Sequence, residues 1–70
     1  MHDQVTIVTL TRLAPRSLDT DNLAASLKAI RDGVADALGT HDGPGGPTWC
    51  YAQERQTTYG VRIIIERLEQ

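Results

Sequence analysis

The feature that most constrains the fold is a long amphipathic stretch in the first half of the chain. Its apolar residues recur at helical spacing and fill an arc about 100° wide. They are Leu23, Leu27, Ile30, Val34, Ala37 and Leu38. Asp19, Thr20 or Asp21 can cap the first free amide groups. Gly39 can adopt the left-handed conformation that ends a helix, so the pattern predicts one helix of about 28 Å.

Three further segments have the composition of β-strands. Val5 to Leu13 combines β-branched residues with threonine and stops before Ala14-Pro15. Its apolar residues fall on both faces, which suits a strand in the middle of a sheet. Residues 48–55 and 59–68 form two more predicted strands, and the short segment between them fits a β-hairpin.

The order of these segments predicts one α+β domain, residues 1–70, built as β-α-β-β. Residues 41–47 are rich in glycine and proline and are expected to form a loop. The sheet is expected to be three-stranded, mostly antiparallel and packed on one long helix. In the last strand Tyr59, Val61, Ile63 and Ile65 share one face, which we expect to lie against the helix, at Leu27, Ile30 and Val34.

The composition indicates a small cytoplasmic protein that gains stability by self-association. A chain of 70 residues buries only about 60% of its unfolded surface, and such a core rarely supplies more than ~3–5 kcal/mol. We therefore expect a homodimer. The single Cys50 cannot form an intrachain disulfide, and no apolar run is long enough for a signal peptide or a membrane span. The net charge of −2 argues against strong autonomous binding of nucleic acid.

The acidic residues that stand out are Asp19 and Asp21 at the start of the helix and Asp42 in the loop beyond it. Paired carboxylates repel unless a cation lies between them, and Mg²⁺ prefers carboxylate oxygens. A single Asp at a helix start is, however, more often a cap, and Asp-Gly is a common turn dipeptide. Both interpretations stay open on the residues alone.

Other candidate sites in the sequence are weaker. His2, His41 and Cys50 do not have the paired spacing of zinc ligands. The glycine-rich loop lacks the preceding strand and the following lysine of a phosphate-binding loop, so no small-molecule cofactor is expected. Trp49 and Tyr51 share one strand face and could stack on bases or anchor an interface, although core packing is favoured for at least one.

The residues around these aspartates form a longer sequence pattern. The segment 16–23, RSLDTDNL, is followed by Lys28, by Asp-Ala-Leu at 36–38 and by Asp42. This combination resembles the RusA-like Holliday-junction resolvases and related phage proteins, over about Val5 to Glu66. In those proteins a strand, an Asp-x-Asp-Asn-Leu motif, an Asp-Ala-Leu segment, an acidic loop and a final hairpin follow one another.

The resemblance implies a Mg²⁺-dependent, structure-specific endonuclease that acts as a homodimer on branched DNA. Asp19, Asp21 and Asp42 correspond to the metal-binding aspartates. The catalytic lysine of the family falls on Ala25, so Lys28 is the nearest substitute. The basic residues that correspond to DNA contacts are Arg12, Arg16 and Arg55.

The sequence also departs from the family. It is shorter before Val5, and its helix is longer by about two turns, which moves Asp42 about 10 Å outward unless the loop folds back or a partner supplies the third ligand. Lys28 has a second interpretation, which we favour, as an ion pair with Asp32 on the helix surface. The alternative function is a non-catalytic dimeric module, phage-derived or otherwise, that keeps the fold without the nuclease.

Overall fold

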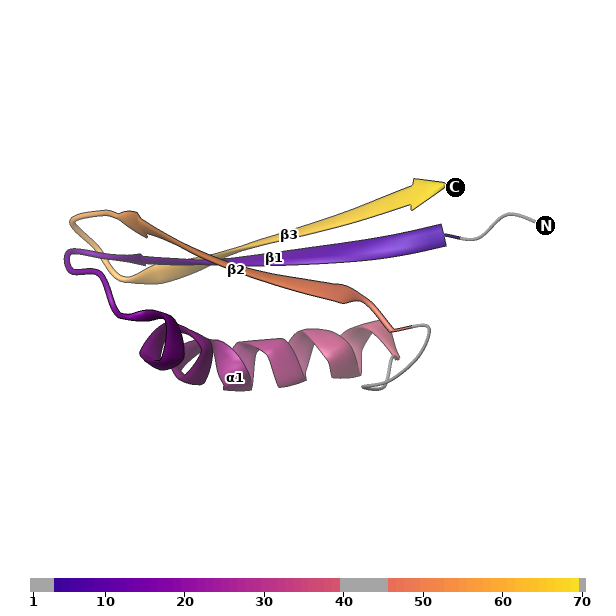
Figure 1. Cartoon of the computed structure of the whole chain (residues 1–70), viewed down its shortest axis with the longest axis horizontal. Coiled ribbons are helices and arrows are strands. Elements are labelled where there is room, and N and C mark those ends of the chain that lie inside the picture. The colour runs from indigo at the N-terminus through magenta and orange to yellow at the C-terminus, as the bar shows by residue number, and fades with distance from the viewer. Residues whose placement is uncertain (1–3, 40–45, 70) are drawn as a thin grey trace.

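The computed structural model describes residues 4–39 and 46–69 and contains one helix and three strands in the predicted order. Figure 1 shows the helix lying along one face of a long, twisted sheet. The α+β fold is therefore confirmed. The elements are β1 (Gln4–Ala14), α1 (Thr20–Leu38), β2 (Thr48–Arg55) and β3 (Gly60–Glu69).

Both ends of α1 are capped as the sequence predicts. Asp19 has an extended backbone, and its Oδ1 accepts a hydrogen bond of 2.8 Å from the backbone N–H of Asn22. At the other end Gly39 has a φ of 68°, and its N–H donates to the carbonyl oxygens of Ala35 and Asp36. Only glycine adopts this left-handed conformation without steric cost, so the helix ends here.

The sheet is mixed, with the order β2-β1-β3, and the prediction of a mostly antiparallel sheet is wrong. β2 runs parallel to β1, because α1 returns the chain to the end at which β1 begins. β3 runs antiparallel to β1. The predicted position of β1 in the middle of the sheet is confirmed.

The predicted hairpin between residues 48–55 and 59–68 is also wrong, because β1 lies between β2 and β3. Pairing with β1 engages every residue of β3, from Gly60 opposite Leu13 to Glu69 opposite Gln4. β2 has eight residues and could not pair along the full ten residues of β3. β1, with eleven residues, is the longest strand and offers the most backbone hydrogen bonds to β3, so β1 takes the central position.

The core lies between α1 and the two parallel strands. Val8 and Leu10 of β1 are 0% exposed, and they pack with Leu23 and Leu27 of α1. Other partly buried apolar residues surround this cluster. They are Leu18, Ile30, Val34, Leu38, Trp49 and Tyr51.

α1 lies over β1 and β2, and within the described residues its backbone does not come close to that of β3. The prediction that β3 packs on the helix is therefore wrong. Ile63 and Ile65 are each 45% exposed, and Val61 and Tyr59 are exposed as well. No helix in the described part of the chain combines the length and the apolar character needed to cross a membrane.

Candidate functional site

Five of the predicted polar residues, namely Arg12, Arg16, Asp19, Asp21 and Arg55, lie at one end of the sheet. β1 and β2 are parallel and α1 connects them, so the carboxyl ends of both strands and the start of α1 lie together, at the left of Figure 1. In units of this kind, ligands bind outside the carboxyl ends of the strands. Arg16 and Asp19 follow β1 directly, and Arg55 ends β2 opposite Ala14.

The connection between β1 and α1 is held in place by the side chain of Gln53. Its Oε1 accepts a hydrogen bond of 2.9 Å from the N–H of Leu18, and its Nε2 donates one of 2.7 Å to the carbonyl oxygen of the same residue. Arg12 adds a third bond, from Nη1 to the carbonyl oxygen of Arg16, at 2.7 Å. These bonds fix the backbone that leads into Asp19.

Sequence reasoning missed Gln53 as a positioning residue. A signal was present, because Gln53 follows Trp49 and Tyr51 at alternate positions of β2 and so shares their inward face. A polar side chain at such a position must find hydrogen-bond partners. The backbone groups of Leu18 supply them.

Asp19 and Asp21 present exposed carboxylates at the start of α1. The capping interpretation of Asp19 is confirmed, because its Oδ1 is hydrogen-bonded to the N–H of Asn22. Asp21 lies in the first helical turn, where a negative charge complements the helix dipole. The same positive helix end disfavours a cation, so a metal ion here would need a further anionic ligand.

Asp42, the predicted third ligand, lies outside the described residues. The described residues that flank it, Gly39 and Gly46, lie at the end of α1 opposite to Asp19. A helix of 19 residues is about 28 Å long. Within residues 4–39 and 46–69, no group of three or more His, Cys, Asp or Glu side chains comes together.

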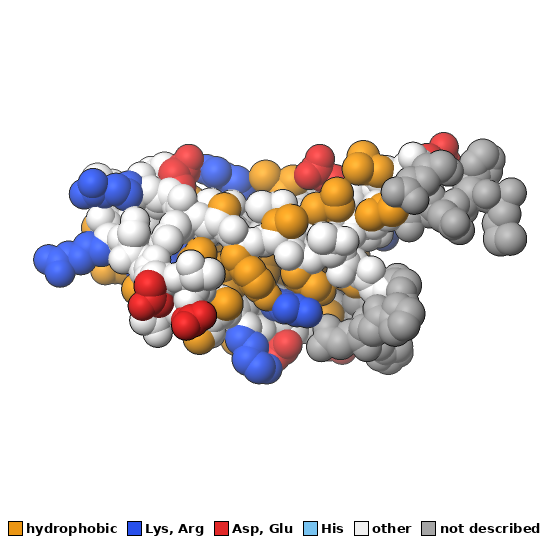
Figure 2. Space-filling view, in the orientation of Figure 1, with side chains coloured by type: hydrophobic (Ala, Val, Ile, Leu, Met, Phe, Trp, Pro, Cys, Tyr) orange, Lys and Arg blue, Asp and Glu red, His pale blue; other side chains and the backbone are white. Residues whose placement is uncertain are grey.

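The three predicted DNA-contacting arginines lie at the same end of the sheet as Asp19 and Asp21. Arg16 and Arg55 are exposed, and Arg12 is partly buried. A depression of about 360 Å³ is lined by Pro15, Arg55, Gln56 and Thr57. Figure 2 shows basic and acidic side chains side by side on this end of the molecule.

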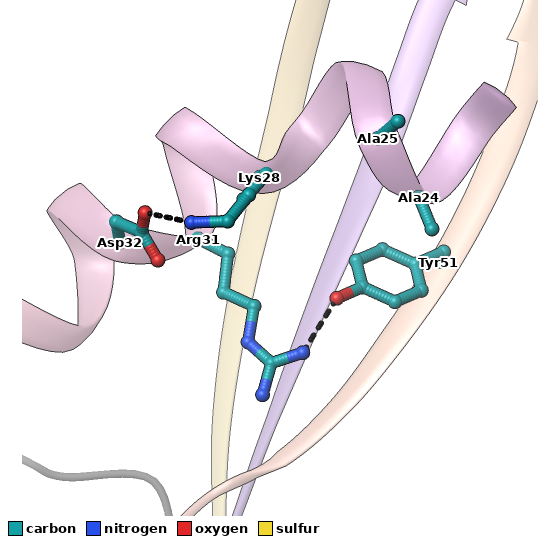
Figure 3. Close-up of a pocket in the computed structure, with 6 residues that line it drawn as sticks. All are labelled: Ala24, Ala25, Lys28, Arg31, Asp32 and Tyr51. Carbon is teal, nitrogen blue, oxygen red and sulfur yellow. Dashed lines mark hydrogen bonds and ion pairs between the residues drawn. The ribbon is translucent and has the colours of Figure 1, made fainter. Parts of the chain in front are cut away.

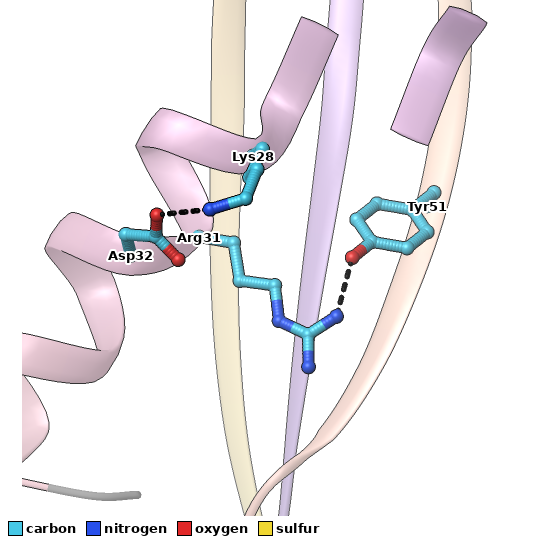
Figure 4. A network of polar contacts seen from close by, with 4 residues as sticks. All are labelled: Lys28, Arg31, Asp32 and Tyr51. Atoms are coloured by element: carbon cyan, nitrogen blue, oxygen red, sulfur yellow. Dashed lines mark hydrogen bonds and ion pairs between the residues drawn. The ribbon is translucent and has the colours of Figure 1, made fainter. Parts of the chain in front are cut away.

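Lys28 lies farther along α1 and interacts with Asp32. Its Nζ is 2.9 Å from Asp32 Oδ2, which confirms the predicted surface ion pair (Figure 4). Both side chains are mostly exposed, so the pair contributes only ~0.3–0.5 kcal/mol. The ammonium group points toward Asp32, whereas Asp21 lies about 10.5 Å away along the helix axis in the other direction.

Arg31, which the sequence analysis did not single out, joins α1 to the aromatic residues of β2. Its guanidinium carbon lies 4.8 Å from the centre of the Trp49 ring. Its Nη1 donates a hydrogen bond of 2.8 Å to the hydroxyl of Tyr51, as Figure 3 shows. These contacts border a depression of about 310 Å³ that also includes Lys28. Core packing, which was favoured for at least one of Trp49 and Tyr51, is confirmed, because both are partly buried against the core.

Glu54 lies near the same end on the opposite face of the sheet. Its Oε2 accepts hydrogen bonds from Gln56 Nε2, at 2.9 Å, and from Arg62 Nη2, at 3.0 Å. The hydrogen bond from Gln56 is the largest cause of a pKa below the usual range for this carboxyl, followed by the bond and charge of Arg62. This ion pair reaches across β1 from β2 to β3.

Comparisons with protein-family models, with curated proteins and with solved structures found no match to this chain. The resemblance to RusA-like resolvases therefore rests on the residues of the Asp-x-Asp-Asn-Leu pattern and those that follow it.

Proposed function

We propose that this chain is a RusA-like endonuclease subunit that uses Mg²⁺ and acts as a homodimer on branched DNA. The main support is that Asp19 and Asp21 share one end of the sheet with Arg16 and Arg55. Carboxylates that hold a divalent cation and arginines that contact phosphates are the two components that phosphodiester hydrolysis needs. Both stand at the carboxyl ends of the parallel strands.

The donor set of Asp19 and Asp21 fits part of a Mg²⁺ site. Both residues are exposed, and within the described residues only Oδ1 of Asp19 is engaged, with Asn22. Mg²⁺ takes one or two carboxylates and keeps several waters. When bound, it would activate a water for attack on the phosphodiester and neutralise developing charge. Asp42 stays the predicted third ligand.

The basic residues divide into two roles under this proposal. Arg16 and Arg55 are exposed at the same end of the sheet as the two aspartates and would bind the DNA backbone. Lys28 would have to leave Asp32 before it could stabilise negative charge near Asp21. We therefore assign Lys28 a smaller contribution than the aspartates.

Cleavage of a synthetic four-way junction in the presence of Mg²⁺ tests the proposal. Asp21→Asn removes a ligand charge and should lower the cleavage rate by about a hundredfold or more. Asp19→Asn should do the same while leaving the helix stable, because asparagine caps a helix about as well as aspartate. Asp36→Asn, on the far part of α1, is the matched control and should cleave like the wild type.

The proposal fails if Asp21→Asn cleaves the junction at the wild-type rate. A Mg²⁺ titration followed by NMR gives a second readout that does not depend on cleavage. Saturable shifts at Asp19 and Asp21 that Asp21→Asn abolishes would support the metal site. The same titration on Asp42→Asn tests whether the predicted third aspartate takes part.

The second candidate is a non-catalytic dimeric module. The observation that favours it is the use of the Asp19 carboxylate as a helix cap, which gives this residue a structural role. Under this alternative the stability of the helix depends on Asp19, but Mg²⁺ produces no saturable shift at either aspartate. Junction cleavage would then be absent in the wild type as well.

A further inference from the structure

The largest unpartnered apolar surface in the described residues belongs to β3. Six large hydrophobic side chains of this strand and of the residue before it are 36–77% exposed. They are Tyr59, Val61, Ile63, Ile64, Ile65 and Leu68. A single domain rarely leaves so many large apolar side chains together in water.

Both faces of β3 carry exposed apolar residues. On the side of the sheet that faces α1, Ile63 lies opposite Leu10 and Ile65 lies opposite Val8, so this row continues the core row of β1. On the other side lie Ile64 and Leu68. Apolar residues on both faces are typical of a strand in the interior of a sheet, but β3 lies at the edge of this one.

The outer edge of β3 is a free hydrogen-bonding edge. β3 pairs with β1 on one side and with no other strand of the described residues. On this edge, alternate residues of the ten-residue strand present unpaired N–H and C=O groups, which form a template for another strand that natural proteins usually cover or interrupt. The radius of gyration is 13.3 Å, compared with about 11 Å for a compact domain of this length. A second copy paired along β3 would widen the sheet, so the assembly would be less elongated than the monomer.

The sequence of β3 is complementary to itself in one antiparallel register. If Ile64 lies opposite Ile64 of the partner subunit, Ile63 lies opposite Ile65 of the partner subunit. In the same register Arg62 lies opposite Glu66 of the partner subunit, and the two-fold symmetry repeats this pair. Opposite charges at facing positions of adjacent strands stabilise the pairing.

The neighbouring registers lack this match. Facing residues of adjacent strands must point to the same side of the sheet, so the two-fold axis must pass between two copies of the same residue. The nearest alternatives to an axis at Ile64 are therefore an axis at Ile63 and an axis at Ile65. A move in one direction sets Arg62 opposite Ile64, and a move in the other sets it opposite Leu68. Both leave Arg62 without a facing acidic residue, whereas the register at Ile64 pairs Arg62 with Glu66 and sets only Arg67 opposite the apolar Val61. Arg62 can keep its bond to Glu54, because a guanidinium has five N–H donors.

We propose that β3 is the dimer interface, where two copies pair antiparallel about an axis at Ile64 to form a six-stranded sheet. The strand order would be β2-β1-β3-β3-β1-β2, with both helices on the same face and antiparallel to each other. The C-terminal end of α1 of the partner would then lie at the end of the sheet that holds Asp19 and Asp21. The proposal shares the homodimer with the proposed function and does not depend on cleavage.

The mass of the full chain in solution, measured by analytical ultracentrifugation, tests the interface. The monomer has a mass of 7.7 kDa, and the wild type should sediment at twice that mass. Ile64→Asp sets two like charges directly opposite each other on the axis and should give monomers. Thr48→Arg adds a charge on β2, the other edge strand, and should leave the dimer intact.

A charge exchange tests the register. Arg62→Glu alone and Glu66→Arg alone each place like charges opposite one another twice, and each should weaken the dimer about tenfold. Mixing the two variants pairs acidic with basic residues at all four positions, so a heterodimer should form at the wild-type affinity. This rescue also shows that each variant is folded.

Three results would overturn the proposal. A wild type that sediments as a monomer even at the highest concentration at which it stays in solution is one, because β3 would then be free for a different partner. Open-ended oligomers are the second, because the two-fold pairing closes at two copies. A mixture of the two charge variants that dimerises no better than either alone is the third, whatever the cleavage assay shows.

Discussion

The two halves of the sheet differ in burial although their sequences are equally apolar. Val8 and Leu10 of β1 are 0% exposed, whereas Ile65 and Ile63, which lie opposite them on the same face, are each 45% exposed. The difference comes from α1, which covers β1 and β2 and stops short of β3. An apolar face is therefore buried only where the helix reaches it.

The width of a helix explains why one strand stays uncovered. An α-helix with its side chains is about 10 Å wide, and neighbouring strands are about 4.8 Å apart. One helix therefore covers about two strands. A sheet of three strands with a single helix must expose the face of the third, unless a second layer is supplied by another chain.

The largest effect that tests this comparison is a cavity in the covered half. Leu27 is 1% exposed, so Leu27→Ala should lower the free energy of unfolding by about 2–5 kcal/mol. Ile63→Ala removes a half-exposed side chain and should cost less, about 1 kcal/mol, at protein concentrations where the chain is monomeric. Urea denaturation measures both. Equal costs would show that Ile63 of β3 is as well packed as Leu27 of α1.

The next effect is the dependence of stability on protein concentration, which tests whether a second copy covers β3. If β3 is covered by a second copy, each tenfold rise in protein concentration should stabilise the dimer by about 1.4 kcal/mol. The midpoint of thermal unfolding should rise accordingly for the wild type and for Leu27→Ala. Ile64→Asp should show a midpoint that does not depend on concentration, and a constant wild-type midpoint would contradict the interface.

A pair of glycines tests the two environments of α1. A Cβ at Gly33 would meet no atom within 4 Å, so Gly33→Ala should stabilise the helix by about 0.4–1 kcal/mol. Gly39 has a φ of 68°, so Gly39→Ala should destabilise it by about 1 kcal/mol. Chemical denaturation of both variants gives the sign. Destabilisation by Gly33→Ala would mean that another surface packs there.

The smallest effect concerns the ion pair that links the covered and uncovered edges of the sheet. Gln56 and Arg62 lower the pKa of the Glu54 carboxyl in the folded chain. The stability that these contacts contribute is therefore present above the unfolded pKa of Glu54 and is lost as the pH falls through its folded pKa. Arg62→Gln should raise this pKa only in part, because the bond from Gln56 remains. NMR titration of the Glu54 carboxyl measures it, with Glu66→Gln as the control.

Much of the helix could be predicted because its signals are local. The apolar residues recur every three or four positions, and the caps Asp19 and Gly39 act on backbone groups a few residues away. The surface pair of Lys28 and Asp32 is equally local, since it joins neighbouring turns. Each of these predictions is confirmed.

The sheet order could not be predicted from the same kind of signal. A short connection such as Gln56 to Tyr59 fits a hairpin, but it also reaches across the end of one intervening strand. The choice depends on which edge offers more pairing, and that is a property of residues far apart in the chain. The antiparallel hairpin was therefore the wrong expectation.

The candidate site shows the same division. Asp19 and Asp21 were expected together because only Thr20 separates them at the start of the helix, and Arg16 and Arg55 join them through the parallel pairing of β1 and β2. Arg31 over Trp49 and Gln53 at Leu18 connect segments more than fifteen residues apart, and only the folded chain brings them together. Asp42, the third predicted ligand, lies outside the described residues.

The sequence by itself determined the elements, their order and the caps of α1, because these depend on backbone preferences and on contacts within a few residues. The tertiary structure decided which strand is central, which apolar face is covered and which polar groups meet at the carboxyl ends of β1 and β2. Those outcomes depend on competition among distant segments for hydrogen bonds and for the one surface that a single helix can cover.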